Sequence, residues 1–471
     1  MTQTLWTAEE LQAITGGTLS AGGWSITGLE IDSRKTGPGD LFLAFEGEQV
    51  DGHAYLDAAS QAGAAAALVS KQVEARLPTL LVSDVLEALE KIAVASRARS
   101  KARIAALTGS VGKTGSKEML AACLRALAPN AHASAGNLNN HIGAPLSLAR
   151  MDEASALAVF ELGMNHPDEI RPLTKMVRPH VALITNVELV HAGHFKYAGE
   201  IATAKSEIFD GVELGGTAVL NADNPYTPYL RERASASGIE KFLTFGRDEG
   251  SDIRLLDLKV TSNSTEVSAD VLGQRMSWSV GGVGDHWGLN SLGVVGVLAA
   301  LELDLEACLP ALSKVSAMRG RGGQVVIDVP GGSFLLIDES YNASPPAVEA
   351  ALKVFAASET SGRRILVLGD MLELGHTSKA AHEGLKAAVE ASGADAVWLI
   401  GPEMKALRDE LPSALVAGWA ETSETLAQEI ANSVRAGDTL LVKGSLGMKM
   451  KHVVNALEAL SPPVSAAGAG G

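Results

Sequence analysis

Cysteine is almost absent from this chain of 471 residues, which has only Cys123 and Cys308. The two cysteines stand far apart in apolar stretches that are typical of helices. Neither has the neighbouring cysteines or histidines that a zinc site or a disulfide framework needs. We therefore expect two buried thiols that behave as small hydrophobic side chains.

Long apolar runs and leader segments are also missing. The longest apolar run, Leu292–Leu301, is far shorter than the about 20 residues that a membrane-spanning helix requires. Residues 1–6 (MTQTLW) lack the basic and apolar regions of a secretory signal. These absences predict a cytoplasmic protein that does not insert into a membrane.

Positive charge is scarce, and it is not concentrated in any long run. Lys and Arg number 39 against 55 Asp and Glu, which gives a formal net charge of −16. A broad interface with a nucleic-acid backbone needs clustered basic side chains, so we expect no nucleic-acid partner. We interpret the excess of negative charge as a feature that keeps the protein soluble.

The chain alternates apolar strand candidates with helical stretches, which predicts an α/β protein of about three domains. We expect a small N-terminal α/β domain (1–99), a central mononucleotide-binding domain with a parallel sheet covered by helices on both faces (100–319), a C-terminal Rossmann-like domain (320–460) and a flexible tail (461–471). Period-two alternation over 253–280 predicts an antiparallel addition to the central sheet. The strand candidates are 40–45, 64–69, 79–82, 157–163, 181–187, 217–223, 334–338, 364–369, 397–401 and 439–443.

The segment 104–114, with the sequence IAALTGSVGKT, has the pattern of a phosphate-binding loop between a strand and a helix. Glycines allow backbone N–H groups to close around phosphate oxygens, and the helix N-terminus adds the positive end of its dipole. In such loops a lysine, here Lys113, contacts the outer phosphates, and the following Thr114 hydroxyl binds Mg²⁺. A full Walker A motif has glycine where Leu107 stands, so an ordinary strand-to-helix turn remains the alternative.

Polar residues follow several of the predicted strands, where side chains face the ligand crevice of a parallel sheet. Glu161 could hold a metal beside the phosphates, or it could cap a helix or form an ion pair. His191 follows the next strand, although a lone histidine is more often structural. Lys205 lies on the helix after it, where a solvated lysine is the default.

Three further residues could contact a nucleotide. We expect Asn290 to begin a long apolar helix, where it could read a base edge or cap the helix. Arg321 stands in a glycine run at the entrance of the third domain, and an arginine brought in by a mobile domain can stabilise a transferring phosphate. Asp338 ends the next strand, where ribose hydroxyls could bind.

Taken in order, these residues and the strings around them resemble the Mur ligase family over nearly the whole chain, from about Ile31 to Leu457. The similar strings are 32–35 with 38–42 (DSRK and PGDLF), 108–114 (TGSVGKT), 136–146 (GNLNNHIGAPL), 161–170 (ELGMNHPDEI), 338–345 (DESYNASP), 367–375 (VLGDMLELG) and 441–445 (LVKGS). The asparagine-rich 136–146 and the segment 161–170 are similar to the branch of the family that adds D-alanyl-D-alanine. The missing glycine of the loop is a trait of this family.

This resemblance implies a ligase that uses ATP to activate the peptide carboxylate of UDP-N-acetylmuramoyl-tripeptide as an acyl phosphate. The amine of D-alanyl-D-alanine then attacks the activated carbonyl, and ADP and phosphate are released. The resemblance further implies two Mg²⁺ ions and a carbamate on Lys205. The metal residues would be Thr114, Glu161, His191 and Lys205, and the catalytic residues Lys113, Glu161, His191, Lys205 and Arg321.

The resemblance also assigns binding residues. Those for ATP would be Thr108, Gly109, Ser110, Val111, Gly112, Lys113, Thr114, Asn290, Arg321, Asp338 and Asn342. Those for the UDP-sugar and peptide substrates would be Ser33, Arg34, Gly47, Asp51, His53, Asn137, Asn139, Asn140, Lys443 and Ser445. We expect a monomer. The alternatives are a related ligase with another acceptor, such as a folylpolyglutamate synthetase, and a nucleotide-gated binding protein without turnover.

Overall fold

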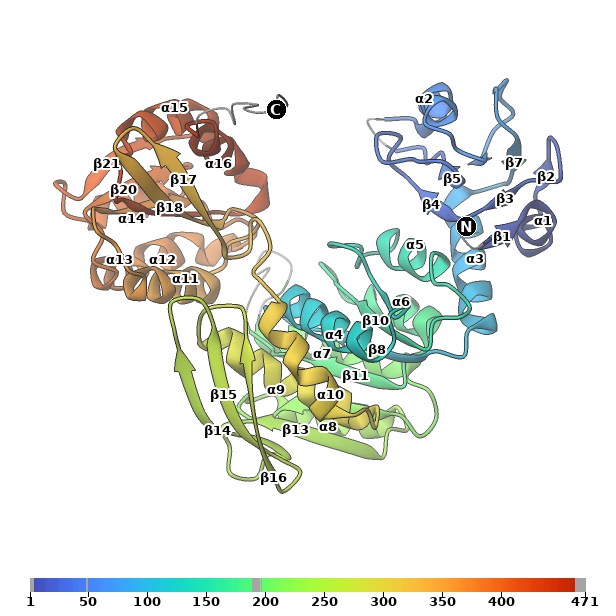
Figure 1. Ribbon diagram of the computed structural model, residues 1–471, viewed down its shortest axis with the longest axis horizontal. Helices are drawn as coiled ribbons and strands as arrows, with labels where there is room; N and C mark the ends of the chain where they lie inside the picture. Colours follow the sequence, from blue (N-terminus) through green and yellow to red (C-terminus); the bar gives the residue numbers. More distant parts are fainter. Residues whose placement is uncertain (1–3, 48–49, 189–194, 196, 462–471) are drawn as a thin grey trace, which may run out of the picture.

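The computed structural model describes residues 4–47, 50–188, 195 and 197–461, which form three α/β units (Figure 1). The N-terminal and C-terminal units stand on opposite sides of the central unit, and the long helix α3 (Val85–Arg99) runs from the N-terminal unit into the central one. Each main sheet lies within one of the three predicted segments. In the described part of the chain, no helix is long and apolar enough to cross a bilayer.

The N-terminal unit contains a five-stranded sheet of order β2-β7-β6-β5-β4, in which only β2 is antiparallel to its neighbour. The strands are β2 (Thr18–Leu19), β4 (Gly28–Glu30), β5 (Asp40–Leu43), β6 (Ala66–Val69) and β7 (Thr79–Leu81), beside a small pair of β1 (Trp6–Thr7) and β3 (Ser25–Ile26). The helices are α1 (Ala8–Thr15), η1 (Gly52–Tyr55), α2 (Leu56–Gln61) and α3.

Helix α3 joins the first two units through buried contacts. Asp84 caps its N-terminus by accepting the N–H of Glu87 at 2.8 Å. Near its C-terminus the buried Arg97 donates from Nε to the carbonyl of Val177 at 2.8 Å and from Nη2 to that of Arg178 at 2.9 Å. These contacts attach the helix to the central unit, and the two units share a hydrophobic core.

The central unit has a nine-stranded sheet of order β16-β15-β14-β13-β12-β11-β8-β10-β9. From β9 to β14 in this order, neighbouring strands are parallel. The pairs β14–β15 and β15–β16 are antiparallel and form the predicted addition. The strands are β8 (Arg103–Thr108), β9 (His132–Ala133), β10 (Leu157–Glu161), β11 (Val181–Ile184), β12 (Thr217–Asn221), β13 (Lys241–Gly246), β14 (Ile253–Val260), β15 (Thr265–Val271) and β16 (Gln274–Val280).

Helices cover both faces of this sheet, as the alternation of its side chains requires. Along β8, Ile104 and Ala106 pack in the core that includes α5, α6, α7 and α8, whereas Ala105 and Leu107 pack in the core of α4 and α9. The helices are α4 (Lys113–Leu127), α5 (Gly143–Ala149), α6 (Ile170–Val177), α7 (Ala198–Ser206), η2 (Glu207–Gly211), α8 (Thr227–Ala236), α9 (Asp285–Ala300), α10 (Leu305–Cys308) and η3 (Leu309–Lys314).

The C-terminal unit has a six-stranded sheet of order β17-β18-β22-β19-β20-β21, which is parallel except for the β17–β18 hairpin. Its strands are β17 (Gly323–Val329), β18 (Gly332–Glu339), β19 (Arg364–Gly369), β20 (Ala396–Ile400), β21 (Val416–Ala420) and β22 (Thr439–Lys443). Its helices are α11 (Pro345–Ala357), η4 (Gly375–Thr377), α12 (Ser378–Glu383), α13 (Lys386–Ala391), α14 (Met404–Glu410), α15 (Ser423–Ser433), η5 (Leu446–Met448) and α16 (Lys451–Glu458).

Candidate functional site

The predicted phosphate loop lies where expected, between β8 and α4. Helix α4 begins at Lys113, its N-cap is Gly112, and no side chain in the described part of the chain caps it. The first backbone N–H groups of a helix have no partner within the helix. The loop therefore presents N–H donors and the positive end of a helix dipole, which together bind an anion.

Two loop positions require glycine. A side chain at Gly109 would overlap the Thr185 hydroxyl. Gly112 has φ +82°, and a Cβ there would lie 2.6 Å from Nδ2 of Asn290. At the position where the Walker A motif has another glycine, Leu107 is fully buried inside β8, so the turn begins after Thr108.

The segment after β11 supports the phosphate loop. The sequence did not reveal this support. Asn186 accepts the N–H of Ser110 at its carbonyl (3.1 Å) and the N–H of Val111 at Oδ1 (3.0 Å). Thr185 donates its hydroxyl to the Val111 carbonyl at 2.8 Å. Strand β11 was predicted to extend to 187 and ends at Ile184, because these residues leave the sheet to hold the loop. The backbone of Glu188 also donates to the Ser110 hydroxyl at 3.0 Å.

Lys113 lies over the loop. Its Nζ donates to the carbonyls of Gly109 (2.6 Å) and Ser110 (3.2 Å). Burial lowers the pKa of Lys113, the nearby carboxylate of Glu161 opposes this, and Arg321 adds to it. The lysine is thus close to two other predicted catalytic residues, one of which belongs to the C-terminal unit.

Glu161 ends β10 and is almost completely buried, with 1 % of its surface exposed. Its Oε1 accepts a hydrogen bond from Nδ2 of Asn139 at 2.8 Å, and its backbone N–H donates to the Ser134 hydroxyl at 3.1 Å. Its Oε2 is buried and has no hydrogen-bond partner among the described residues. A buried carboxylate oxygen without a partner is costly unless something else binds there, and hard cations such as Mg²⁺ prefer this ligand.

Lys205 is buried near the end of α7, with 2 % of its surface exposed, so the default of a solvated lysine is wrong. Burial, and secondarily the charge of Lys113, lower its pKa well below the usual value. The neutral amine is therefore favoured at this position.

Of the other two predicted metal-binding residues, the structure describes Thr114 but not His191. Thr114 is buried in the first turn of α4, with 3 % of its surface exposed. His191 lies outside the described residues. Within the described ranges, no group of three or more His, Cys, Asp and Glu side chains could hold a metal ion. The predicted metal-binding residues that the structure describes are Thr114 with its hydroxyl, Glu161 with its carboxylate and the buried Lys205.

The asparagine-rich segment, residues 136–140, is attached to α4 through a residue that the sequence did not single out. Lys117, buried on α4, donates from Nζ to the carbonyls of Ser134 (2.8 Å) and Gly136 (3.2 Å). Asn140 accepts the N–H of Gly143 at 2.8 Å and so supports the start of α5. The segment is thereby held where Asn139 reaches Glu161.

Asn290 does not cap a helix, so that alternative is wrong. Helix α9 begins at Asp285 after its N-cap Gly284, and Asn290 lies in its second turn. Its side-chain amide stands against Gly112 of the phosphate loop. The asparagine thus faces the candidate nucleotide site from the helix that covers the same side of the sheet.

The C-terminal unit reaches the loop through Arg321 and Tyr341. The guanidinium carbon of Arg321 lies 4.0 Å from the centre of the Tyr341 ring. The Tyr341 hydroxyl accepts a hydrogen bond from Nδ2 of Asn137 at 2.8 Å. This contact joins the C-terminal unit to the asparagine-rich segment of the central unit, beside the loop.

Asp338 and Asn342 are used locally in this structure. Asp338 accepts the N–H of Gly320 at Oδ2 (2.8 Å) and that of Ser340 at Oδ1 (3.0 Å). It therefore fixes the entry segment that carries Arg321. Oδ1 of Asn342 accepts the N–H of Ala343 at 2.8 Å.

Lys443 ends β22 and Ser445 follows it, next to the end of β18. Nζ of Lys443 donates to Oε2 of Glu339 and to the carbonyl of Asn342, both at 3.1 Å. The Ser445 hydroxyl accepts the N–H of Leu372 at 2.8 Å. The carboxyl ends of the adjacent parallel strands β18 and β22 bring Glu339 and Lys443 together. Glu339 was not singled out by its pattern.

The predicted substrate residues of the N-terminal unit fall into two groups. Oδ1 of Asp51 lies 2.7 Å from Nδ1 of the buried His53, and its Oδ2 accepts from Nζ of Lys71 at 2.6 Å. Because the backbone N–H of Ser70 donates to Nε2 of His53 at 3.1 Å, Nδ1 carries the proton. Lys71 was missed because it stands alone in the sequence.

In the second group Arg34 and Gly47 are exposed and Ser33 is half-buried. Arg34 donates from Nε and Nη2 to the carboxylate of Asp32, both at 2.8 Å, and lowers the pKa of Asp32 to about 2. Ser33 lies in the same turn, and the N–H of Gly47 donates to the carbonyl of Val50 at 2.9 Å. Whether either group binds a substrate stays a prediction.

Comparisons with known proteins agree with this architecture. Three family models match: the Mur ligase family catalytic domain over residues 25–97, the Mur ligase middle domain over 107–298 and the Mur ligase glutamate ligase domain over 324–446. The UDP-N-acetylmuramoyl-tripeptide–D-alanyl-D-alanine ligase of Escherichia coli (strain K12) is 35% identical over 454 residues, covering 96% of this chain and 98% of that protein.

Solved structures are similar over the same length. A crystal structure of MurF from Acinetobacter baumannii matches with a TM-score of 0.82 and 29% identity, covering 96% of this chain and 99% of that one. The MurF ligase of Thermotoga maritima in complex with ADP matches with a TM-score of 0.73 and 26% identity, covering 92% and 97%. The chain belongs to the Mur ligase family.

Proposed function

We propose that this protein is an ATP-dependent ligase that joins D-alanyl-D-alanine to UDP-N-acetylmuramoyl-tripeptide in the synthesis of peptidoglycan precursors. The observation that carries the proposal is Lys113 at the open N-terminus of α4, which interacts electrostatically with Glu161, Lys205 and Arg321. Similarity over nearly the full length to ligases with this name supports the choice of substrates.

The first step activates a poor electrophile. A carboxylate oxygen of the tripeptide attacks the γ-phosphorus of ATP, a new O–P bond forms, and the bond to the β-phosphate oxygen breaks to release ADP. Both reactants are anions, so cations must neutralise their approach. We assign this role to Lys113, whose Nζ lies over the loop, and to Arg321 of the C-terminal unit, whose charge acts on Lys113.

In the second step the amine nitrogen of D-alanyl-D-alanine attacks the carbonyl carbon of the acyl phosphate. A C–N bond forms, the amine loses a proton, and the C–O bond to phosphate breaks. Lys443 and Ser445, at the carboxyl ends of the C-terminal sheet, are the residues we assign to the peptide substrates. Ser33, Arg34, Gly47, Asp51 and His53 are assigned to the UDP-sugar.

The residues present fit a Mg²⁺ ion beside the phosphates. Glu161 offers a buried carboxylate oxygen without a partner, and Thr114 offers a buried hydroxyl. When bound, Mg²⁺ would neutralise phosphate charge and polarise the γ-phosphate. We assign Glu161 and Thr114 to this ion, with His191 and Lys205 as the further residues of a two-metal site.

Lys205 fits a carbamate better than it fits an ammonium ion. The lowered pKa favours the neutral amine, whose Nζ can attack carbon dioxide, form an N–C bond and lose a proton. The product is an anion, which the positive charge of Lys113 would stabilise where it disfavours an ammonium ion. Such a carbamate would supply carboxylate-like oxygens for the second Mg²⁺ ion.

The same proposal includes the organisation of the chain. We propose a UDP-sugar domain over 1–99, an ATP-binding domain over 100–319 and a ligase domain over 320–460, acting as a monomer in the cytoplasm. The contact of Arg321 with Tyr341, and of Tyr341 with Asn137, supports closure of the third domain over the second.

One assay separates this function from its alternatives. Phosphate release is measured with ATP, Mg²⁺ and UDP-N-acetylmuramoyl-tripeptide, with and without D-alanyl-D-alanine. The proposal expects release that requires the dipeptide. Release that requires glutamate instead indicates a related ligase with another acceptor, and nucleotide binding without release indicates a binding protein.

A further inference from the structure

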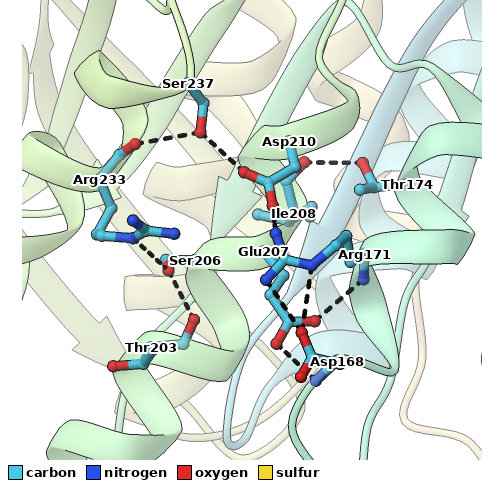
Figure 2. Close-up of polar contacts among 10 residues, drawn as sticks. All are labelled: Asp168, Arg171, Thr174, Thr203, Ser206, Glu207, Ile208, Asp210, Arg233 and Ser237. Atoms are coloured by element: carbon cyan, nitrogen blue, oxygen red, sulfur yellow. Dashed lines mark hydrogen bonds and ion pairs between the residues drawn. The ribbon is translucent and has the colours of Figure 1, made fainter.

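A hydrogen-bonded network joins the segment after Lys205 to the segment after Glu161 (Figure 2). Helix α7 ends at Ser206, and the turn η2 begins directly with Glu207. The carboxylate of Glu207 accepts the backbone N–H of Asp168 at 2.7 Å and that of Arg171 at 3.1 Å. Glu207 thus caps the start of α6 from another element.

Glu207 is suited to holding backbone and unsuited to binding a ligand. Only 3 % of its surface is exposed, and its two oxygens each accept a different N–H of the α6 start. Asp168 adopts φ +64°, a left-handed conformation that is uncommon outside glycine. The bond to Glu207 stabilises this conformation.

Arg171 forms a second layer of the same network. Its guanidinium donates to Oδ1 of Asp168 from Nε (3.2 Å) and Nη2 (3.1 Å), and it pairs through Nη1 with Asp210 of η2. Thr174, one turn further along α6, donates its hydroxyl to the carbonyl of Ile208 at 2.7 Å. Helix α6 and turn η2 are therefore joined along two turns of helix.

Helix α8 completes the network on the other side. Ser237 donates to Oδ1 of Asp210 at 2.9 Å, and Nε of Arg233 donates to the Ser206 hydroxyl at 3.3 Å. That hydroxyl in turn donates to the carbonyl of Thr203 at 2.6 Å, inside α7. The last turn of α7, which contains Lys205, is thus held from both of its flanks.

We propose that Glu207 is a positioning residue that sets the distance between Lys205 and Glu161. Lys205 lies two residues before Glu207, and Glu161 lies at the end of the strand that leads into the capped segment. Without the cap, α6 and η2 would still be joined through Arg171 with Asp210 and through Thr174 with Ile208, but the backbone that leads from Glu161 into α6 would lose its direct hydrogen bonds to Glu207. The catalytic role of Lys205 and Glu161 rests on the function proposed above. The hydrogen-bonded network between their two segments does not depend on that function.

The test compares Glu207→Gln with a matched control, Asp438→Asn. In the variant side chain, one carboxylate oxygen becomes an NH₂ group that faces a backbone N–H, so the cap is half lost. Asp438 is also buried, accepts the backbone N–H groups of Arg363 (3.1 Å) and Arg435 (2.8 Å), and pairs with the Arg363 guanidinium. It lies just before β22, at the N-terminal end of the strand.

Three quantities are measured on the full chain. They are amide hydrogen exchange in residues 167–174 and 198–206, the dissociation constant of a non-hydrolysable ATP analogue with Mg²⁺, and the split of activity into kcat and KM. Glu207→Gln is expected to raise exchange in both segments and to weaken binding of the Mg²⁺-bound analogue. It is expected to lower kcat by about tenfold or more, with KM for the UDP-sugar substrate unchanged. Asp438→Asn is expected to change exchange in the C-terminal unit only.

Faster exchange confined to 167–174, with 198–206 and binding of the Mg²⁺-bound analogue as in the wild type, would overturn the proposal. If Glu207→Gln does not fold, Arg171→Lys removes the forked contacts with Asp168 and Asp210 and is expected to act in the same direction. Unchanged exchange in 198–206 for that variant would also overturn it. If the wild type releases no phosphate with the proposed substrates, the function fails, and exchange and analogue binding still decide the role of Glu207.

Discussion

The side-chain amide of Asn139 donates to one carboxylate oxygen of Glu161 at 2.8 Å, and the other oxygen of Glu161 is buried without a hydrogen-bond partner among the described residues. The amide orients the carboxylate, so that its second oxygen is available to a cation. The resemblance assigned Asn139 to the substrate side. In the structure, Asn139 contacts Glu161, the candidate metal ligand.

Replacing Asn139→Ala tests this contact. The buried carboxylate would lose its donor, and residues that orient metal ligands contribute about 10- to 100-fold to activity. We expect kcat to fall by about that factor and the Mg²⁺ concentration for half-maximal activity to rise, with KM for the UDP-sugar substrate unchanged. A rise in that KM alone would show that Asn139 binds substrate. Asn130→Ala, which removes a hydrogen bond to the Ala154 carbonyl in the same unit, is the control.

Lys205→Ala tests the carbamate. The variant removes the anion that would bind the second Mg²⁺, so activity should be lost, and a short carboxylate such as formate should restore part of it. Activity is measured by phosphate release at increasing formate concentration. Lys175→Ala, at an exposed position on α6, is the control. Full activity of Lys205→Ala would show that no carbamate is required.

The phosphate loop predicts opposite outcomes for two glycines three residues apart. Gly112→Ala forces an alanine into a left-handed conformation, at a cost of about 1–2 kcal/mol, and brings its Cβ against Asn290. We expect loss of nucleotide binding by calorimetry. Gly115→Ala lies inside α4, where the new Cβ would meet Trp287 at an ordinary 3.5 Å, and should raise stability by about 0.5–1 kcal/mol. Equal effects of the two substitutions on binding would contradict the assigned geometry.

Stability should depend on pH through His132 of β9. Burial lowers the pKa of His132 to about 4, whereas an unfolded histidine titrates near about 6.5. The unfolded chain therefore binds the proton first, and stability should fall as pH drops from about 6.5 to about 4, by about 1–3 kcal/mol from this residue. Urea unfolding at several pH values measures the slope, which His132→Gln should reduce. An unchanged slope would show that His132 does not contribute. Burial also lowers the pKa of His180, so part of the slope should remain.

Local patterns predicted the elements that are long and regular. Strands β10, β18, β19 and β22 lie where apolar runs indicated them, and the alternation over 253–280 correctly predicted the antiparallel addition. Strands of two residues, such as β9, carry no readable period. Helix α9 begins five residues before Asn290, because the pattern located its apolar body and not its cap.

The candidate site was predictable where residues follow strands and unpredictable where a contact crosses between elements. Glu161 and Lys443 could be placed because the carboxyl ends of parallel strands share one edge. The burial of Lys205 depends on the packing of α7 against α8 and η2, which no local pattern records. The contacts of Lys117 with Ser134 and of Glu207 with Asp168 join residues 17 and 39 positions apart.

The most direct test of the central claim follows an oxygen atom from substrate to product. UDP-N-acetylmuramoyl-tripeptide is labelled with ¹⁸O in the carboxylate that reacts, and the phosphate released with ATP and D-alanyl-D-alanine is analysed by mass spectrometry. The account predicts that the phosphate contains one ¹⁸O atom from the carboxylate, because the O–P bond formed in the first step survives the second. Unlabelled phosphate, or release that does not require the dipeptide, would contradict it.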